Sequence, residues 1–302
     1  MKIMKEGICP LIHLNCPTDL NCQQRINIPQ SPALIELKSA VFQTLNDASE
    51  DISEFKDTLV NDHSIIPHLT HLLIQFASQS QLDKKTDSQE QHNQQQSESS
   101  SSISFISSYI NLLYYLILYN YNNNNNNICN VVINTPNALH SLCTLTSYKI
   151  NIHFNQENDK QTFEVRSSSG EFLYSIQSCG DASTQTELVN ARYAGALVIA
   201  ISTAGGAGEE NDWGICDRLR YISQFLSSLN KGRINDYSSF PPQPLLARRS
   251  NEQIEEEGGN EEIESQISNK GLRGNMRNIA SKVKGEILNY FIEQGNPRPS
   301  WY

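Results

Sequence analysis

The chain has 302 residues and a formal net charge of −10 at pH 7. This length allows one large domain, two smaller domains or an elongated array of repeats. The negative charge argues against nonspecific binding to nucleic acid or to anionic membranes. Only 38% of the residues are hydrophobic, because asparagine, glutamine and serine are used heavily, so part of the chain cannot contribute to a core. The seven scattered cysteines indicate reduced thiols, and we expect an intracellular protein, cytoplasmic or nuclear, without a secretory signal.

Residues 1–30 form a leader that prolines interrupt too often for a long helix. The leader carries residue types that bind zinc, in the spacing Cys-x3-His-x2-Cys-x5-Cys: Cys9, His13, Cys16 and Cys22. This order matches no zinc-finger spacing and contains no CxxC pair, so it predicts ordinary thiols and no structural metal.

Residues 31–78 are predicted to form a helical repeat unit. Ser31-Pro32 supplies a capping hydroxyl and a proline at the first helical position, and apolar residues follow at helical spacing. A short amphipathic piece is expected over 52–61, and a third helix over 64–77. Three helices within this length are the size of one repeat.

Two histidines of this third helix, His68 and His71, share a face at i, i+3. This spacing can suit a metal pair. Because no cysteine or carboxylate lies near them in the sequence, we expect surface histidines instead.

Two segments of low complexity are predicted to be disordered. Residues 79–102 are rich in glutamine and serine, and residues 122–127 are asparagine, so neither can bury enough apolar surface to fold. Between them, residues 103–121 are long enough to span a membrane, at ~20 residues. Serine and asparagine interrupt this segment and its flanks lack basic residues, so we favour a buried helix.

Residues 103–232 are expected to form the main helical repeat region. A helix is predicted over 136–148, and a shorter one over 172–178. Residues 150–154 and 162–165 alternate like strands, so we favour a small hairpin there over irregular structure.

The chain is organised around residues 184–203, which read as the central helix of a helical stack. From Tyr193 to Ile201 the sequence is almost continuously apolar, so a helix there must be covered on several sides. A strand of this length would contain too much alanine. Small residues, including Gly195, allow neighbouring helices to come close.

The glycine-rich segment 205–212 is compared with phosphate-binding loops, because glycine-rich backbone can cradle a phosphate. It follows a helix and ends in acidic residues, which repel phosphate, so we expect a helix stop and no nucleotide cofactor. A helix with a clear apolar stripe follows over 213–230. No catalytic motif is present: the serines lack a nucleophile elbow and the carboxylates cluster in solvated segments, so we expect no enzyme.

The C-terminal part is predicted to contain a proline-containing linker over 233–250 and a charged helical extension over 251–302. The extension has an acidic block at 252–264 and a basic amphipathic helix after it. Such a helix can contact a membrane or a calmodulin-like partner. We favour a terminal helix that docks on the stack, because the ends of a solenoid need capping.

Two segments resemble armadillo repeats. Ala194-Gly195-Ala196-Leu197 resembles the core of the third helix of such a repeat, and Ile66-Pro67-x-Leu69-x-x-Leu72-Leu73 is similar to the pattern of the second helix. The resemblance implies an all-α, irregular armadillo-like α-solenoid that acts as a non-catalytic scaffold or adaptor for a protein or peptide. The alternatives are a membrane-associated adaptor that uses 103–121 or the basic helix, and a regulatory piece once joined to an enzyme.

The resemblance also implies a partner-binding stripe on the third helix: Arg192, Gly195, Ile199 and Ser202. Armadillo proteins often place an asparagine two residues after the core leucine, where it holds a peptide backbone, and Ile199 stands there in this chain. An isoleucine and a glycine suit an apolar partner side chain better, with Arg192 at the edge. In the alternative, the helix is wholly internal and covered by the C-terminal helix.

Overall fold

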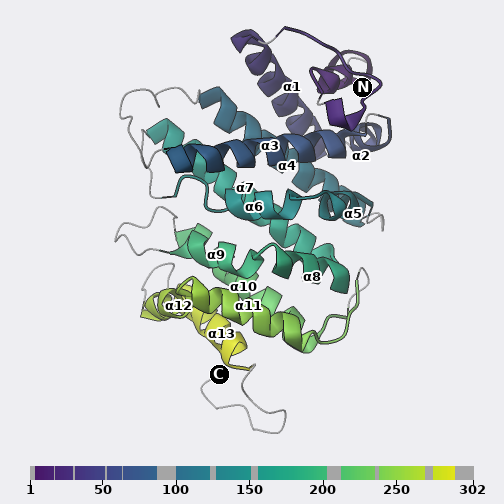
Figure 1. The fold of residues 1–302 in the computed structure, drawn as a ribbon. Coiled ribbons are helices and arrows are strands. Elements are labelled where there is room, and N and C mark those ends of the chain that lie inside the picture. The colour runs from purple at the N-terminus through teal and green to yellow at the C-terminus, as the bar shows by residue number, and fades with distance from the viewer. Residues whose placement is uncertain are drawn as a thin grey trace. The chain divides into compact units, whose positions relative to one another are not determined.

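The structure is a computed structural model, and it is all-α in the part of the chain that it describes, as predicted (Figure 1). Two compact units are distinguished: unit 1 within residues 1–148 and 153–175, and unit 2 within 149–152 and 176–302. The described residues are 4–16, 18–29, 31–51, 53–62, 64–86, 100–122, 127–150, 156–202, 212–234, 238–268 and 275–289.

Unit 1 begins with short turns of the leader and continues with six helices and the first part of a seventh. Their bounds are η1 (Met4–Ile8), η2 (Cys9–His13), η3 (Thr18–Leu20), α1 (Pro32–Asp51), α2 (Ser53–Asp57), η4 (Thr58–Asp62), α3 (Ile65–Thr86), α4 (Ser100–Asn122), α5 (Asn127–Asn134), α6 (Ala138–Leu145) and α7 (Gln156–Cys179). The predicted start of α1 is confirmed, because the hydroxyl of Ser31 accepts a hydrogen bond from the Leu34 N–H at 3.3 Å.

The core of unit 1 is built where α1 packs against α4. The ring of Tyr109 meets that of Phe42 edge-on, with centroids 4.2 Å apart, and Ser108 donates to Gln43 at 2.8 Å. The 103–121 segment is therefore a helix buried inside unit 1, as favoured from the sequence. None of the described helices combines the length and apolarity needed to cross a membrane.

Helix α3 extends further than its apolar pattern predicts, through Thr86 rather than Ala77. In this extension Ser80 is buried, and Gln81 donates to the hydroxyl of Thr144 on α6 at 3.1 Å. Packing against α6 thus carries the helix into the segment predicted to be disordered. Residues 87–99 and 123–126, which include the rest of the two low-complexity segments, lie outside the described residues.

The predicted hairpin is wrong. Residues 162–165 lie within α7, a single helix of 24 residues, and 151–155 lie outside the described residues. The helix predicted over 172–178 is the last part of α7, and the rest was missed because much of the buried face is polar: Gln161, Thr162, Arg166, Ser168, Ser169, Ser175 and Gln177. The guanidinium group of Arg166, for example, donates to the carbonyl of Tyr148 at 3.2 Å, so burial here is satisfied by hydrogen bonds.

Unit 2 takes the end of α7 and the remaining helices. These are α8 (Ala182–Asn190), α9 (Tyr193–Ile201), α10 (Asp212–Lys231), α11 (Pro244–Glu256), α12 (Gly259–Ser268) and α13 (Asn275–Asn289). The predicted central helix is two helices rather than one, because Arg192 adopts a left-handed conformation with φ of 63° and breaks the chain between α8 and α9.

Helix α9 is buried along nearly its whole length, as its apolarity predicts. It contacts α8, α10, α11 and α12, and the ring of Tyr193 lies edge-on to Phe225 of α10 at 5.1 Å. The small residues allow this close packing. A Cβ added to Gly259 of α12 would lie 2.9 Å from a methyl carbon of Val198, and also within 2.8 Å of Ile254.

The C-terminal helices belong to unit 2. Helix α11 begins inside the predicted linker and crosses its boundary at residue 250, burying Leu246 and Ala247. Before it, the backbone of Phe240 exchanges two hydrogen bonds of 2.9 Å with Arg233. Helix α13 docks on α10 through Met276 and the apolar residues that follow it, as the docking interpretation predicts. The glycine-rich loop at 203–211 lies outside the described residues.

Candidate functional site

The predicted partner-binding stripe begins at Arg192, which is engaged within unit 2. Its guanidinium group donates to Glu256 at 2.7 Å and to Glu257 at 3.1 Å. The hydrogen bond to Glu256, and to a smaller extent the one to Glu257, raises the pKa of Arg192 above its ordinary value. The arginine therefore joins the start of α9 to the end of α11.

The other three residues of the stripe follow the same pattern. Gly195 lies against α11, where an added Cβ would be 3.3 Å from the Glu257 side chain, and Ser202 donates to Glu262 of α12 at 3.3 Å. Ile199 is half-buried. Three of the four positions thus contact C-terminal helices, which agrees with the alternative of an internal helix. The partner-binding role of the stripe remains a prediction.

A second group of chemically capable residues lies in unit 1, where the leader meets α3. His13, Cys16 and His68 are buried and Cys22 is half-buried. Each residue offers one potential ligand atom, and these four atoms all lie within 4.8 Å of one another. We call these four residues the His–Cys cluster.

Direct contacts hold the His–Cys cluster together. The sulfur of Cys22 lies 3.2 Å from Nδ1 of His13. The imidazole rings of His13 and His68 meet edge-on, with centroids 5.1 Å apart. Nδ1 of His68 is buried and has no hydrogen-bond partner among the described residues. One histidine of the cluster therefore has a buried ring nitrogen that is unsatisfied.

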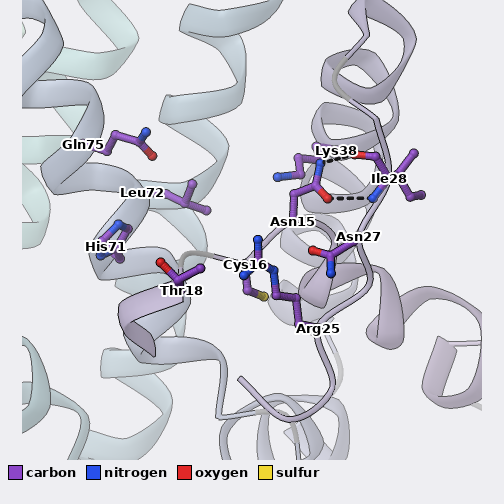
Figure 2. Close-up of a pocket in the computed structure, with 10 residues that line it drawn as sticks. All are labelled: Asn15, Cys16, Thr18, Arg25, Asn27, Ile28, Lys38, His71, Leu72 and Gln75. Carbon is purple, nitrogen blue, oxygen red and sulfur yellow. Dashed lines mark hydrogen bonds between the residues drawn. The ribbon is translucent and has the colours of Figure 1, made fainter. Parts of the chain in front are cut away.

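The leader backbone explains why three of the donors converge. Asn15, in a left-handed conformation with φ of 48°, donates its N–H to the carbonyl of Ile26, and the Ile26 N–H donates to the carbonyl of His13. The side-chain amide of Asn15 also exchanges two hydrogen bonds with the backbone of Ile28 (Figure 2). These bonds bring residues 26–28 next to residues 13–15 and close the loop between them. Cys16 and Cys22 both lie in this loop, and His13 lies at the point where it closes.

A cavity of about 490 Å³ lies beside the His–Cys cluster. Figure 2 shows side chains of α3 on one side of it and residues of the leader, with Lys38 of α1, on the other. Its lining is mostly polar: Asn15, Cys16, Thr18, Arg25, Asn27, Ile28, Lys38, His71, Leu72 and Gln75. Because Cys16 belongs to both the cluster and the lining, the cavity gives access to the cluster.

The surroundings of the cluster favour uncharged donors in the absence of an ion. The pKa of Cys16 is raised to about 12, first by burial and then by a hydrogen bond with Cys22, and the positive charges of Lys38 and Arg25 oppose this rise. Burial also lowers the pKa of His68, and His71 adds to that effect. A neutral imidazole keeps the lone pair with which histidine binds a metal.

Sequence reasoning identified three members of the cluster and missed the fourth. Cys9 is buried but lies outside the cluster, and His68 takes its place as the fourth donor. His68 was expected at the surface, yet only 7% of it is exposed. The sequence offered one signal for His68: the leader lacks a complete, regularly spaced set of zinc ligands, and His68 lies near the apolar side of the third predicted helix.

The sequence was also compared with known proteins. No protein-family model matches the chain, and no match is found among curated proteins.

Proposed function

We propose that the chain is a non-catalytic scaffold that binds a protein partner through exposed apolar side chains of unit 2. One observation carries the proposal. The two most exposed large apolar side chains in the described part are Ile234 and Leu245, at 96% and 75%, and both follow the C-terminal end of α10. Trp213, at 67%, lies in the first turn of α10, at the opposite end of this helix. Exposed apolar groups of this size mark interaction surfaces when they gather on one region, and the segments that carry Ile234 and Leu245 both lie beside the C-terminal end of α10.

The segments that carry Ile234 and Leu245 are fixed to the body of unit 2. Arg233 pairs with the backbone of Phe240, and its guanidinium group donates to the carbonyl of Gln177 at 2.8 Å. The N–H of Gln243 donates to the carbonyl of Leu229, in the last turns of α10, at 2.7 Å. A fixed backbone loses little conformational entropy when a partner binds. This end of α10 therefore suits a binding surface better than α9, whose stripe is engaged by α11 and α12.

The finer architecture is part of the proposal: the helices are arranged as an irregular armadillo-like α-solenoid. Two features support it. The Ile66–Leu73 pattern lies on α3 and the Ala194–Leu197 pattern on α9, and apolar residues of both are buried, as repeat cores would be. Small-angle X-ray scattering tests the arrangement, because a solenoid gives an elongated particle and a globular bundle a compact one. A compact particle would contradict the solenoid.

Variants of the exposed residues test the scaffold function. We expect Ile234→Ser with Leu245→Ser to abolish capture of partners that the wild-type chain retains in quantitative affinity purification. Trp213→Ser, at the opposite end of α10, should leave this capture unchanged. Because these side chains are exposed, the substitutions should leave folding unchanged, which circular dichroism can verify. The matched control is Leu37→Ser, at an exposed position of unit 1. Equal capture by wild type and the double variant would refute this surface.

A further inference from the structure

We propose that His13, Cys16, Cys22 and His68 form a structural zinc site in unit 1, with each residue providing one ligand. Two thiolates and two imidazoles are a donor set that zinc takes in closed, tetrahedral sites. The oxygen ligands that magnesium and calcium require are not part of this set.

The distances are close to those of a formed site. Zinc–sulfur bonds of about 2.3 Å and zinc–nitrogen bonds of about 2.0 Å place tetrahedral ligand atoms about 3.3–3.8 Å apart. The four atoms already lie within 4.8 Å of one another, and Cys22 Sγ and His13 Nδ1 are 3.2 Å apart. Side-chain shifts of about 1 Å are therefore enough to gather the ligands around an ion.

The unsatisfied atom in the cluster points to a missing partner. Nδ1 of His68 is buried without a hydrogen bond, and a buried polar atom in that state destabilises a fold. Nδ1 is therefore taken as the ligand atom of His68, because a zinc ion bonded to this nitrogen satisfies it. Imidazole needs no deprotonation to bind, whereas each of the two thiols releases one proton to solvent, so two thiolates balance the double charge of the ion.

The site is structural rather than catalytic, because four protein ligands leave no open position for a substrate or water. Three of the ligands belong to the leader and the fourth to α3. The ion therefore fastens the leader to the body of unit 1. The cavity that Cys16 lines provides the entry path (Figure 2).

This proposal replaces the expectation of ordinary thiols in the leader. That expectation was based on residue spacing within the leader alone. A zinc site depends on which ligand atoms lie close together in space, and here one of them belongs to α3. Cys9, the nearest thiol in the sequence, lies outside the cluster and serves as an internal control.

The test begins with the full-length protein, purified under reducing conditions without chelators. We expect elemental analysis to find one zinc per chain. Removal of zinc should lower Tm by several degrees and zinc addition should restore it. Cobalt(II), a spectroscopic substitute for zinc, should give the visible absorption and thiolate charge-transfer bands of a tetrahedral site.

Ligand variants separate coordination from folding. Cys16→Ser and His68→Gln should lose the cobalt bands and the stoichiometric zinc, whereas Cys9→Ser and His71→Gln should keep both. His68→Cys retains four ligands and should bind cobalt with a charge-transfer absorption about half again as strong, since three thiolates replace two. This variant keeps the test decisive even if Cys16→Ser or His68→Gln fails to fold.

Several results would overturn the site. One is wild-type protein without zinc that also gives no tetrahedral cobalt spectrum. Another is a disulfide between Cys16 and Cys22 that persists in protein treated with excess reductant. Unchanged zinc content in a folded His68→Gln variant, or its loss in folded His71→Gln, would equally exclude the proposed ligand set.

Discussion

The carboxylate of Glu286 is buried in unit 2, and the ammonium group of Lys231 lies 2.7 Å from it. Lys231 ends α10 and Glu286 lies near the end of α13, so the pair joins the ends of two helices that pack along each other. The other carboxylate oxygen, Oε2, has no hydrogen-bond partner among the described residues. The lysine is therefore the main charge that compensates this buried carboxylate.

The first prediction follows from this pair. Lys231→Met should lower the free energy of unfolding by about 2–4 kcal/mol, because it leaves the buried carboxylate of Glu286 without its counter-charge. The loss is limited because about half of the Lys231 side chain is exposed, so solvent already screens the ion pair. Urea denaturation followed by circular dichroism measures the change. Adding Glu286→Leu should recover most of the stability, since no charge then remains to be compensated. A double variant no more stable than Lys231→Met would show that the pair is not the cause.

The second prediction tests whether α9 is a core helix. Leu197 is fully buried, so Leu197→Ala should cost about 2–5 kcal/mol of unfolding free energy. Arg192→Ala should cost less than about 1 kcal/mol, because half of its side chain is exposed and its ion pairs are screened by solvent. Chemical denaturation of both variants gives the comparison. Similar small losses for both would mean that α9 is peripheral to the core of unit 2.

The third prediction concerns the hydroxyl of Tyr109 in unit 1. It is buried without a hydrogen-bond partner among the described residues, and burial raises its pKa well above the ordinary value. Tyr109→Phe should leave stability unchanged or raise it by up to about 1 kcal/mol, because a desolvated hydroxyl is removed and the ring is kept. Thermal denaturation measures this change.

The matched control for the hydroxyl is Tyr109→Leu. It removes the ring contacts with Phe42 and with Phe105, whose centroid lies 4.0 Å away, and should cost about 1–3 kcal/mol. A loss of similar size in Tyr109→Phe would reveal a hydrogen bond to this hydroxyl.

The sequence predicts best where burial and apolarity coincide. Residues 213–230 carry a clean apolar stripe, and α10 runs from Asp212 to Lys231. In α7 the buried face includes Gln161, Thr162 and Arg166, whose donor groups bond to nearby residues of the helix or to the backbone of Tyr148. The first part of this helix therefore has no apolar period to detect, whereas the part predicted over 172–178 does.

Two further features depend on contacts between distant segments. The chain breaks at Arg192, although no glycine or proline stands at that point in the sequence. Ion pairs with Glu256 and Glu257 hold Arg192 at the start of α9. The His–Cys cluster needs His68 to meet the leader, and no local spacing rule relates them. Both features arise from tertiary packing.

The last prediction concerns Cys143 of α6. Burial raises the pKa of its thiol from an ordinary value of 9.0 to about 12. At pH 8 the folded protein should therefore not be modified at Cys143 by maleimide, whereas the urea-unfolded protein should be, as peptide mass spectrometry can show. Labelling of Cys143 in the native protein at a rate close to that of the unfolded chain would contradict its burial.

The same thiol makes stability depend on alkaline pH. Above pH 9 the unfolded chain loses the Cys143 proton while the folded protein keeps it, so the stabilisation present below pH 9 is lost progressively as pH rises towards about 12. Cys143→Val keeps a small apolar group and removes the ionisation. The unfolding free energy of the wild type relative to this variant should therefore be lower at about pH 10.5 than at about pH 8. An equal difference at both pH values would show that the thiol ionises as readily in the folded protein as in the unfolded chain.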